Sequence, residues 1–457
     1  MVGLGKSGVA SALFLADRGA QVSVSDAKSP EQLREGIPVL LDHGISVETG
    51  QHGERTFRDQ DFIVVSPGVP YDVPPLVHAR ERGILVIGEV ELAARFLKGH
   101  IVGITGSNGK TTTTTLAGDI LAASGRKTLV GGNIGTPAIT FADRADDDTW
   151  LVLEISSFQL ETIQTFHPQI AVVLNVTPDH LDRHRTFENY LAVKARIFEN
   201  QTATDFAVLN ADSEPCVSLA PRSKAAVCWF SRRKEVEHGA FVRGDHILWR
   251  DRHGAREILP LIEIGLKGSH NIENVLAGVC VGMLAGVRPE QIRRAVADFR
   301  AVEHRLEYVD TVNGVEYYND SKATNVDATI KALESFPGRI HLILGGKDKG
   351  SDYAVLNDLL QQRVKRVYTI GAAAAKIESQ ARGTEIVGVG TLEAAVKRAS
   401  EAASPGDIVL LAPACASFDQ FNSYEHRGRV FKDIVRQLAA RKQDRERVGS
   451  SVPGGKE

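Results

Sequence analysis

A lysine and a run of hydroxyl side chains directly follow a glycine-rich turn in the segment Ile101–Leu121, IVGITGSNGKTTTTTLAGDIL. An apolar strand is expected to enter this turn and a helix to leave it. The N–H groups of such a turn, the helix N-terminus, Lys110 and the Thr111 hydroxyl could together hold the phosphates of ATP and a Mg²⁺ ion. We therefore predict an ATP-binding loop made of Gly106, Ser107, Asn108, Gly109, Lys110, Thr111, Thr112 and Thr113.

The spacing of this loop differs from the usual phosphate-loop pattern. G-x-x-x-x-G-K-[ST] requires a glycine five residues before the second glycine. Ile104 stands at that position relative to Gly109, and the glycines present are Gly103 and Gly106. A plain glycine turn before an ordinary helix is the alternative, but the lysine and threonine that follow directly favour a phosphate site.

Polar residues also follow two later apolar runs. Glu154 ends LVLE, where an ionised carboxylate is costly unless it meets solvent or a cation, and a Mg²⁺ ion beside Thr111 would be such a cation. The segment NVTPDHLDRH suits metal, phosphate or acid–base chemistry, although a capped helix start after Pro178 would also explain it. Its polar members are Asp179, His180, Asp182, Arg183 and His184.

Three further polar loops follow apolar runs nearer the C-terminus. They are NDSKATN with Asp320 and Lys322, GGKDKG with Lys349, and ACASFDQF with Ser417. Each alone could be a turn, but together they indicate a substrate and nucleotide face. Lys194 in FENYLAVKARIFEN has only the spacing of a solvated helix lysine. A serine hydrolase is not supported, because no G-x-S-x-G occurs.

The elements that position these residues alternate between strand-like and helix-like runs, which is the pattern of parallel α/β sheets. We predict an α/β fold of three consecutive domains, 1–92, 93–299 and 300–440, followed by a charged, frayed tail at 441–457. The first domain opens with MVGLGKSG, a weak dinucleotide-binding fingerprint of Gly3, Gly5 and Gly8. Only Met1 and Val2 precede it, so either the start is truncated or the domain tolerates a short first strand.

Composition limits the class of protein. The 457 residues are 43% hydrophobic and 24% charged, as in soluble globular proteins, and they exceed what one core usually serves. No apolar run approaches the roughly 18 residues that a membrane helix needs. Four scattered cysteines fit a reducing cytoplasm, and a net charge of -3 argues against nucleic acid as a partner. We expect a cytoplasmic monomer that binds neither membranes nor nucleic acid.

The motifs together resemble the Mur ligase family of peptidoglycan synthesis, and most closely its member that adds D-glutamate. GSNGKTT, GGNIG, LEISSFQLE, NVTPDHLDRH, GSHNIENVLA, EHRLE, NDSKATN and ACASFDQF are similar to that family's signatures in their order, over almost the whole chain. The unusual loop spacing is also the family's own. The resemblance implies a UDP-binding Rossmann-like domain, a central P-loop ATPase domain and a C-terminal Rossmann-like domain.

The resemblance also implies the reaction. ATP would phosphorylate the terminal carboxylate of UDP-N-acetylmuramoyl-L-alanine, and the amino group of D-glutamate would attack the acyl phosphate, releasing ADP and phosphate. Lys110, His180 and Lys194 would be catalytic. Mg²⁺ would be held by Thr111, Glu154, His180 and Lys194, the last in the place of a lysine carbamylated by CO₂.

The remaining site residues implied by the family fall into three groups. ATP would also contact Asn274, Arg305 and Asp320. D-Glutamate would be surrounded by Lys322, Thr324, Lys349, Ser417 and Tyr424, since its two carboxylates require cations and hydroxyl donors. The UDP substrate would contact Ser7, Asp26, Lys28, Asn133, Ser157 and Gln159.

Three alternatives stay open. Another Mur-type or folylpolyglutamate-type amide ligase would share the phosphate loop and the carbamylated lysine, but NDSKATN and ACASFDQF favour the D-glutamate-adding member. An NAD-binding oxidoreductase would use Gly3, Gly5 and Gly8 and would leave the later phosphate loop unexplained. A nucleotide-binding regulator without catalytic activity is the third.

Overall fold

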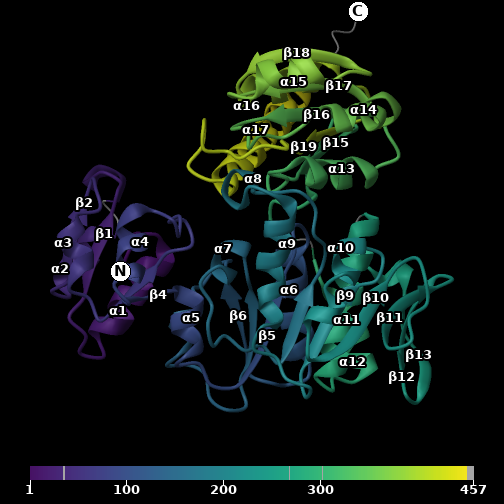
Figure 1. The fold of residues 1–457 in the computed structure, drawn as a ribbon. Coiled ribbons are helices and arrows are strands. Elements are labelled where there is room, and N and C mark those ends of the chain that lie inside the picture. Colours follow the sequence, from purple (N-terminus) through teal and green to yellow (C-terminus); the bar gives the residue numbers. More distant parts are fainter. Residues whose placement is uncertain (34–35, 267, 301, 450–457) are drawn as a thin grey trace, which may run out of the picture. The chain divides into compact units, whose positions relative to one another are not determined.

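The computed structural model describes residues 1–33, 36–266, 268–300 and 302–449 (Figure 1). The chain folds into two compact units. The first contains Met1–Pro178, Arg183–Ile264 and Ile272–Phe299, and the second contains Asp179–Asp182, Gly265–Asn271 and the chain from Arg300 onward. Both units consist of helices and mainly parallel strands, which confirms the predicted α/β class.

The first ninety or so residues form short parallel strands with helices between them. Val2 takes the position of a first strand between two strand pairs. It forms a β-bridge with Ser25 on one side and with Val65 on the other, and so connects the pair β1–β2 to the pair β3–β4. The elements are α1 (Lys6–Ala16), β1 (Ser23–Asp26), α2 (Ile37–Asp42), β2 (Ser46–Thr49), α3 (Glu54–Arg58), β3 (Phe62–Val65), α4 (Pro74–Glu81), β4 (Leu85–Gly88) and α5 (Glu89–Ala94).

The rest of the first unit is built on one sheet, in which nine strands of the described chain follow the order β13-β12-β11-β10-β9-β8-β5-β7-β6. Strands β5 to β10 run parallel, and their apolar side chains are buried, as expected for a sheet covered on both faces. These strands are β5 (His100–Thr105), β6 (Thr128–Gly132), β7 (Trp150–Glu154), β8 (Ile170–Val173), β9 (Phe206–Asn210) and β10 (Ala226–Ser231).

An antiparallel extension completes this sheet beyond β10. It consists of β11 (Gly239–Arg243), β12 (His246–Asp251) and β13 (Gly254–Pro260), of which β11 pairs with β10 in parallel. The rhythm of strands and helices in the sequence did not predict it. The helices of this part are α6 (Lys110–Ala123), α7 (Ser157–Leu160), α8 (Leu181–His184), α9 (Phe187–Ala195), α10 (Glu214–Val217), α11 (Ser269–Leu284) and α12 (Pro289–Asp298), with a 3-10 turn η2 at Ala138–Phe141.

The second unit holds a sheet whose order over the described residues is β14-β15-β19-β16-β17-β18. Every pair except β14–β15 is parallel. The strands are β14 (Glu307–Val312), β15 (Val315–Asn319), β16 (Ile340–Gly345), β17 (Val364–Ile370), β18 (Glu385–Gly390) and β19 (Ile408–Leu411), and the helices are α13 (Val326–Glu334), α14 (Asn357–Arg363), α15 (Ala374–Gln380), α16 (Leu392–Ala402) and α17 (Tyr424–Gly449).

This topology places polar loops next to one another. The loops after β15, β19 and β16 carry NDSKATN, ACASFDQF and GGKDKG, and these three strands are parallel neighbours, so all three loops leave the same edge of the sheet. The predicted tail, 441–457, begins within α17, and its residues 450–457 lie outside the described part of the chain. None of the described helices combines the length and apolar character needed to span a bilayer.

Candidate active site

The glycine-rich loop leaves β5 at Thr105 and enters α6 at Lys110. Gly109, the residue before the helix, has a left-handed φ of 85°. A Cβ added to it would lie 2.2 Å from Oδ1 of Asn274, which also accepts a hydrogen bond from the Thr113 hydroxyl at 3.2 Å. Glycine is therefore required here for both its conformation and its small size. Asn274, which was predicted to contact ATP, lies against this loop.

Asn175, two residues after the end of β8, fixes the shape of the loop. Its backbone oxygen accepts from Ser107 N at 2.9 Å, its side-chain oxygen accepts from Asn108 N at 2.8 Å, and its side-chain nitrogen donates to Asn108 O at 3.1 Å. No role for this residue was predicted from the sequence. An asparagine at the end of an apolar strand adjacent to β5 was the available signal.

Lys110 lies back along the loop that precedes it. Its Nζ donates to the backbone oxygens of Gly106 and Ser107, at 2.8 and 2.9 Å. A flexible ammonium held by neutral carbonyls can turn toward an anion, because a phosphate oxygen is a stronger acceptor than a carbonyl.

Thr111, in the first turn of α6, meets Glu154, the last residue of β7. The Thr111 hydroxyl donates to Oε2 of Glu154 at 2.7 Å, and Asn133, just beyond β6, donates to Oε1 at 2.8 Å. Glu154 is only 1% exposed. The structure thus joins the two residues predicted to hold Mg²⁺, and the set of hydroxyl, carboxylate and amide oxygens is of the kind that Mg²⁺ prefers.

Lys194 is not a solvated helix lysine, so the interpretation from spacing alone is wrong. Its side chain is buried against the back of the phosphate loop, where Nζ donates to Gly106 O at 2.9 Å and to the Thr105 hydroxyl at 3.3 Å. Its Nζ also lies 4.7 Å from the centre of the Tyr190 ring. Helix α9 therefore presents this amine to the loop rather than to water, because Lys194 lies on the buried face of the helix with Tyr190.

The residues predicted for the uridine end lie around the first glycine loop. Asp26 is buried, and its two carboxylate oxygens accept from Leu4 N at 2.7 Å and from Lys28 N at 2.9 Å. Asp26 therefore ties the glycine loop to the end of β1. Ser7 lies in the first turn of α1, and the Lys28 side chain is exposed.

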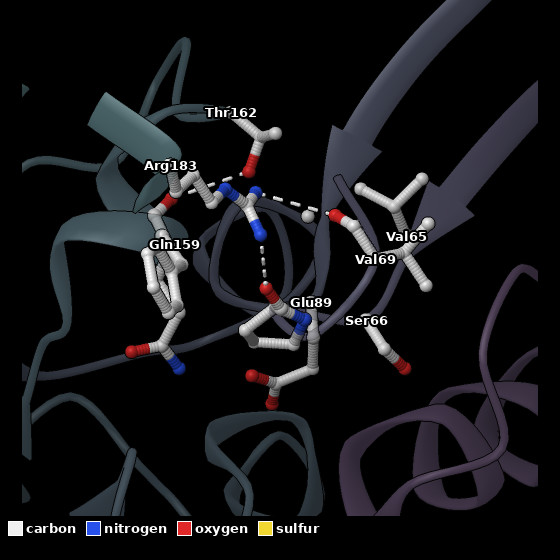
Figure 2. Close-up of a pocket in the computed structure, with 10 residues that line it drawn as sticks. Val65, Ser66, Val69, Glu89, Gln159, Thr162 and Arg183 are labelled. Carbon is white, nitrogen blue, oxygen red and sulfur yellow. Dashed lines mark hydrogen bonds between the residues drawn. The ribbon is translucent and has the colours of Figure 1, made fainter. Parts of the chain in front are cut away.

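Ser157 and Gln159 belong to α7, which begins with a capping box at Ser156. The Ser157 hydroxyl is 2.9 Å from Nε2 of His184, and Gln159 Oε1 accepts from Ser156 N at 2.9 Å. Arg183, in α8, is ion-paired with Glu161. Its guanidinium also donates to the carbonyls of Pro67 and Val69 (Figure 2). Arg183 and His184 from the NVTPDHLDRH cluster are thus fixed by neighbouring groups.

His180 belongs to the second unit and lies just before α8, with a left-handed φ of 53°. Its Nε2 is 3.6 Å from Asp179 Oδ2, and the other Asp179 oxygen is 3.8 Å from Nζ of Lys349. His180 and Lys349 border an open cavity with Lys347 and with Ala416 and Phe418, the neighbours of Ser417. Two lysines, a histidine and the loop that carries Ser417 therefore border one recess in this unit.

Asp320 and Arg305, predicted to contact ATP, lie close together in the second unit. Burial raises the pKa of Asp320 to about 6, although the charge of Arg305 and the N–H of Leu306 act in the opposite direction. The Leu306 N–H donates to Asp320 Oδ1 at 3.2 Å. Arg305 Nε is buried and has no hydrogen-bond partner in the described part of the chain.

Arg427 connects two of the predicted D-glutamate loops. It is fully buried, and its guanidinium donates to the hydroxyl and carbonyl of Ser321, at 3.0 and 2.8 Å, and to Cys415 O at 3.1 and 3.2 Å. Ser321 precedes Lys322, and Cys415 lies two residues before Ser417. Arg427 was not predicted, because its partners are distant in the sequence: Cys415 is more than ten residues away and Ser321 more than one hundred.

The other predicted D-glutamate residues lie around these loops. Nζ of Lys322 is 5.1 Å from the centre of the Tyr424 ring, and Thr324 N donates to Lys322 O at 2.8 Å. Ser417 is buried, and its carbonyl accepts from Gln420 N and Phe421 N. The Lys322 ammonium of the loop after β15 therefore lies beside the Tyr424 ring at the start of α17.

Family models match three successive parts of the chain. The Mur ligase MurD-like N-terminal domain matches residues 1–88, the Mur ligase middle domain matches residues 104–282, and the Mur ligase glutamate ligase domain matches residues 304–415.

Two relatives and two solved structures are similar over nearly the full length. UDP-N-acetylmuramoylalanine--D-glutamate ligases of Koribacter versatilis and Acidobacterium capsulatum are 70% and 61% identical, covering 96% and 95% of this chain and 97% and 95% of their own. The UDP-N-acetylmuramate-alanine ligase of Thermotoga maritima has a TM-score of 0.61 at 20% identity, covering 95% of this chain and 98% of its own. The MurF ligase of the same organism, in complex with ADP, has a TM-score of 0.61 at 17% identity, covering 96% and 98%.

The two solved structures support the fold, and the identity to the two relatives extends over the phosphate loop and all three matched domains. The chain belongs to the Mur ligase family.

Proposed function

We propose that this protein is an ATP-dependent amide ligase that adds D-glutamate to UDP-N-acetylmuramoyl-L-alanine in peptidoglycan synthesis. The observation that carries the proposal is the 70% identity, over 96% of the chain, to a relative named for this reaction. The phosphate loop with Lys110, Thr111 and Glu154 supports it independently, because its geometry suits a nucleotide triphosphate with a divalent cation.

The reaction must turn a carboxylate, which is a poor electrophile, into an acyl phosphate. ATP supplies the phosphoryl group, and the amino group of D-glutamate then displaces phosphate to form the amide. All reactants are anionic, so the protein has to supply donors, cations and positioning rather than a covalent nucleophile. The N–H groups at Gly106–Thr113 and the Lys110 ammonium serve the phosphates, and Asn274, Arg305 and Asp320 serve the rest of the nucleotide.

The metal-binding residues are proposed from the donor set. Thr111 and Glu154, 2.7 Å apart, would hold Mg²⁺, whose bound charge would offset that of the transferring phosphoryl group. His180 and a carbamylated Lys194 would complete the metal-binding set. The burial of Lys194 supports a carbamate, since bulk water is kept from that amine.

The amino-acid substrate has two carboxylates and needs at least two positive or hydroxyl-bearing partners. We assign D-glutamate to the loops after β15, β19 and β16, with Lys322, Thr324, Lys349, Ser417 and Tyr424 as its contacts. The parallel pairing of these three strands supports the assignment, because it brings the loops to one sheet edge.

The UDP substrate is assigned to the first unit. Ser7, Asp26 and Lys28 would contact its uridine end, and Asn133, Ser157 and Gln159 its muramoyl-alanine part. The fixing of the glycine loop by Asp26 supports this position, because a rigid loop can approach a diphosphate closely.

A phosphate-release assay tests the reaction. Release of phosphate from ATP is expected only when UDP-N-acetylmuramoyl-L-alanine and D-glutamate are both present. Equal turnover with L-glutamate or meso-diaminopimelate would contradict the assignment and would favour a related ligase. Binding of NAD but not ATP in a calorimeter would favour the oxidoreductase alternative.

Lys194 has its own test. Lys194→Ala is expected to lose turnover and retain ATP binding, because the donors of Gly106–Thr113 remain, whereas a purely nucleotide-binding protein would have no turnover to lose. Depletion of CO₂ should lower activity reversibly, and a mass spectrum under bicarbonate should show the adduct on the peptide that contains Lys194. Absence of that adduct in active protein would exclude the carbamate.

We further propose that the enzyme acts as a monomer in the cytoplasm. The substrates are nucleotide-linked or free metabolites of the cell interior, and each predicted ligand contact comes from one chain. Light scattering at the concentration of the assay should give the mass of a single chain, and a dimer mass would contradict this part of the proposal.

A further inference from the structure

A small cavity in the first unit contains two buried polar atoms that lack a hydrogen-bond partner in the described chain. They are Oε2 of Glu89 and Nε2 of Gln159. Glu89 is 0% exposed and Gln159 is 2% exposed, and both line the same small cavity, whose volume of about 10 Å³ has room for one group the size of a water molecule. Buried polar atoms nearly always have a partner, so two unpaired atoms that line one cavity indicate a ligand or an ordered water.

Both side chains are fixed by the atoms that are already paired. Oε1 of Glu89 accepts from Ile139 N at 2.8 Å, and Oε1 of Gln159 accepts from Ser156 N at 2.9 Å and from the Ser156 hydroxyl at 3.1 Å. One acceptor and one donor are therefore presented in defined directions. Gly88, the neighbour of Glu89, has no room for a side chain, because a Cβ there would lie 2.3 Å from the Thr162 hydroxyl oxygen.

Arg183 does not satisfy either atom. Its guanidinium forms an ion pair with Glu161 and donates hydrogen bonds to the carbonyls of Pro67 and Val69. In the view of Figure 2 the Glu89 carboxylate and the Gln159 amide both lie on the same side of that guanidinium. The cavity is therefore lined by one buried acceptor and one buried donor that the guanidinium does not pair.

We propose that Glu89 is a further substrate-binding residue, which together with Gln159 binds one hydroxyl or secondary amide of the muramoyl-alanine part of the UDP substrate. That group would donate to Glu89 Oε2 and accept from Gln159 Nε2. The inference rests on the proposed function, in which Gln159 contacts this part of the substrate. Glu89 is added to the site by the structure, since it follows a strand without any motif.

The charge state of Glu89 gives the binding a pH dependence. Burial raises the pKa of Glu89 to about 7, although the N–H groups of Ile139 and Ala138 act in the opposite direction. Few charged groups surround Glu89: η2, β3 and β4 have no titratable side chain, and α1 has only the exposed Lys6. Arg183 lines the same cavity, but its charge is paired with Glu161. On α5 itself, Glu91 is ion-paired with Arg95.

A substrate group that donates to Oε2 favours the ionised carboxylate. Affinity for the substrate should therefore rise with pH as Glu89 loses its proton. With a pKa of about 7, the ionised fraction increases roughly tenfold between about pH 6 and pH 8, so the apparent Kd should fall by roughly tenfold over that range. Glu89→Gln keeps the shape of the side chain but removes the titration, and it should bind more weakly at the upper pH with a flat profile.

Calorimetric titration with UDP-N-acetylmuramoyl-L-alanine and, separately, with UDP tests the proposal. The proteins are the wild type, Glu89→Gln, and Glu91→Gln as a matched control on the same helix. Glu91 is buried too, but its carboxylate is satisfied by the N–H groups of Gln164, Thr165 and Phe166. Glu89→Gln should flatten the profile for the full substrate and leave the affinity for UDP unchanged, and Glu91→Gln should retain the wild-type profile.

Two results would overturn the inference. An unchanged Kd and pH profile in Glu89→Gln would mean that the two atoms bind a water molecule only, and an equal loss of UDP affinity would place Glu89 at the uridine end. Failure of the wild type to bind the full substrate would instead contradict the proposed function, so the two failures are distinguishable.

Discussion

Replacement of Arg427 by leucine should unfold the second unit at a lower denaturant concentration and leave the first unit unchanged. The guanidinium is fully buried and donates to carbonyls of two loops that lie about one hundred residues apart in the sequence. Within the described chain, Ser321 O and Cys415 O accept from no other donor, whereas Ala416 O also accepts from Lys347 N. The substitution would therefore leave two buried carbonyls without a partner.

The expected loss in free energy of unfolding follows from these two carbonyls and from the cost of burying the Arg427 charge. Each unpaired buried carbonyl costs about 1–3 kcal/mol. Burial lowers the pKa of Arg427 to about 10, so the folded protein already bears a cost for the charge, and leucine removes that cost. The net loss should be about 2–4 kcal/mol. Arg427→Lys, which keeps the charge but not the planar set of donors, should lose less.

The assay uses the distribution of tryptophan in the chain. All three tryptophans, Trp150, Trp229 and Trp249, lie in the first unit. In a urea titration, tryptophan fluorescence should therefore keep its wild-type midpoint in Arg427→Leu. Circular dichroism, which follows both units, should show an earlier transition. Arg436→Leu on the same helix is the matched control, because Arg436 is exposed and its loss should change stability by less than about 0.5 kcal/mol.

Steady-state kinetics distinguish an effect of Arg427 on the proposed D-glutamate loops from an effect on the whole enzyme. Because Arg427 fixes the loops of Lys322 and Ser417, Arg427→Lys should raise the KM for D-glutamate more than the KM for ATP. An unchanged circular-dichroism midpoint in Arg427→Leu would refute the reasoning about the two carbonyls. Equal increases in both KM values would refute the role in positioning the D-glutamate loops.

Three further predictions concern the rest of the molecule. Glu89→Gln should stabilise the protein by up to roughly 3 kcal/mol at about pH 8 and by little near pH 4, as measured by urea unfolding. The reason is that the pKa of Glu89 is raised from 4.5 to about 7, so ionisation of this carboxyl opposes folding as pH rises. A stabilisation that does not depend on pH would contradict this prediction. Gly109→Ala should weaken ATP binding by at least about tenfold in a calorimeter, since its Cβ would collide with Asn274, and unchanged affinity would refute that contact. Asp407→Asn should cost the second unit about 2 kcal/mol near pH 7. Burial alone would raise the pKa of the Asp407 carboxyl, but Lys365, the Ser404 N–H and Arg339 hold this pKa well below its usual range. The stabilisation present above the unfolded pKa is lost as pH falls, so an equal cost at about pH 7 and about pH 2 would exclude the ion pairs as its cause.

The parallel part of the fold could be predicted from the sequence because its signals are local. Continuous apolar runs ending in polar residues marked β5, β7, β8, β16 and β19, and the structure confirms each of them. The antiparallel extension β11–β13 was missed, since its strands alternate apolar and charged residues within a long connection and contain none of the motifs. The pairing order of the strands was likewise not readable, because it depends on packing between distant segments.

The site residues likewise divide into those with a local sequence signal and those without one. Those that would touch ligands stand in loops with glycine, lysine or hydroxyl patterns, so Lys110, Thr111 and Glu154 could be named from the sequence. Lys194 had only the spacing of a helix lysine, and its burial became evident from tertiary structure alone. The resemblance to a family pointed to it, and the physical pattern did not.

The residues that no pattern identified act on other protein groups rather than on ligands. Asn175 shapes the phosphate loop from the neighbouring strand, and Arg427 joins two loops of the second sheet. Each makes several hydrogen bonds to backbone atoms of a segment that is distant in the sequence, so neither its type nor its local spacing is distinctive. Because parallel strands end at one sheet edge, their loops converge there, but the loops also need such cross-links to hold a defined shape. The sheet edge that carries these loops therefore depends on a second group of polar residues, and substitutions in that group should disturb the shape of the loops while leaving the proposed ligand-binding side chains in place.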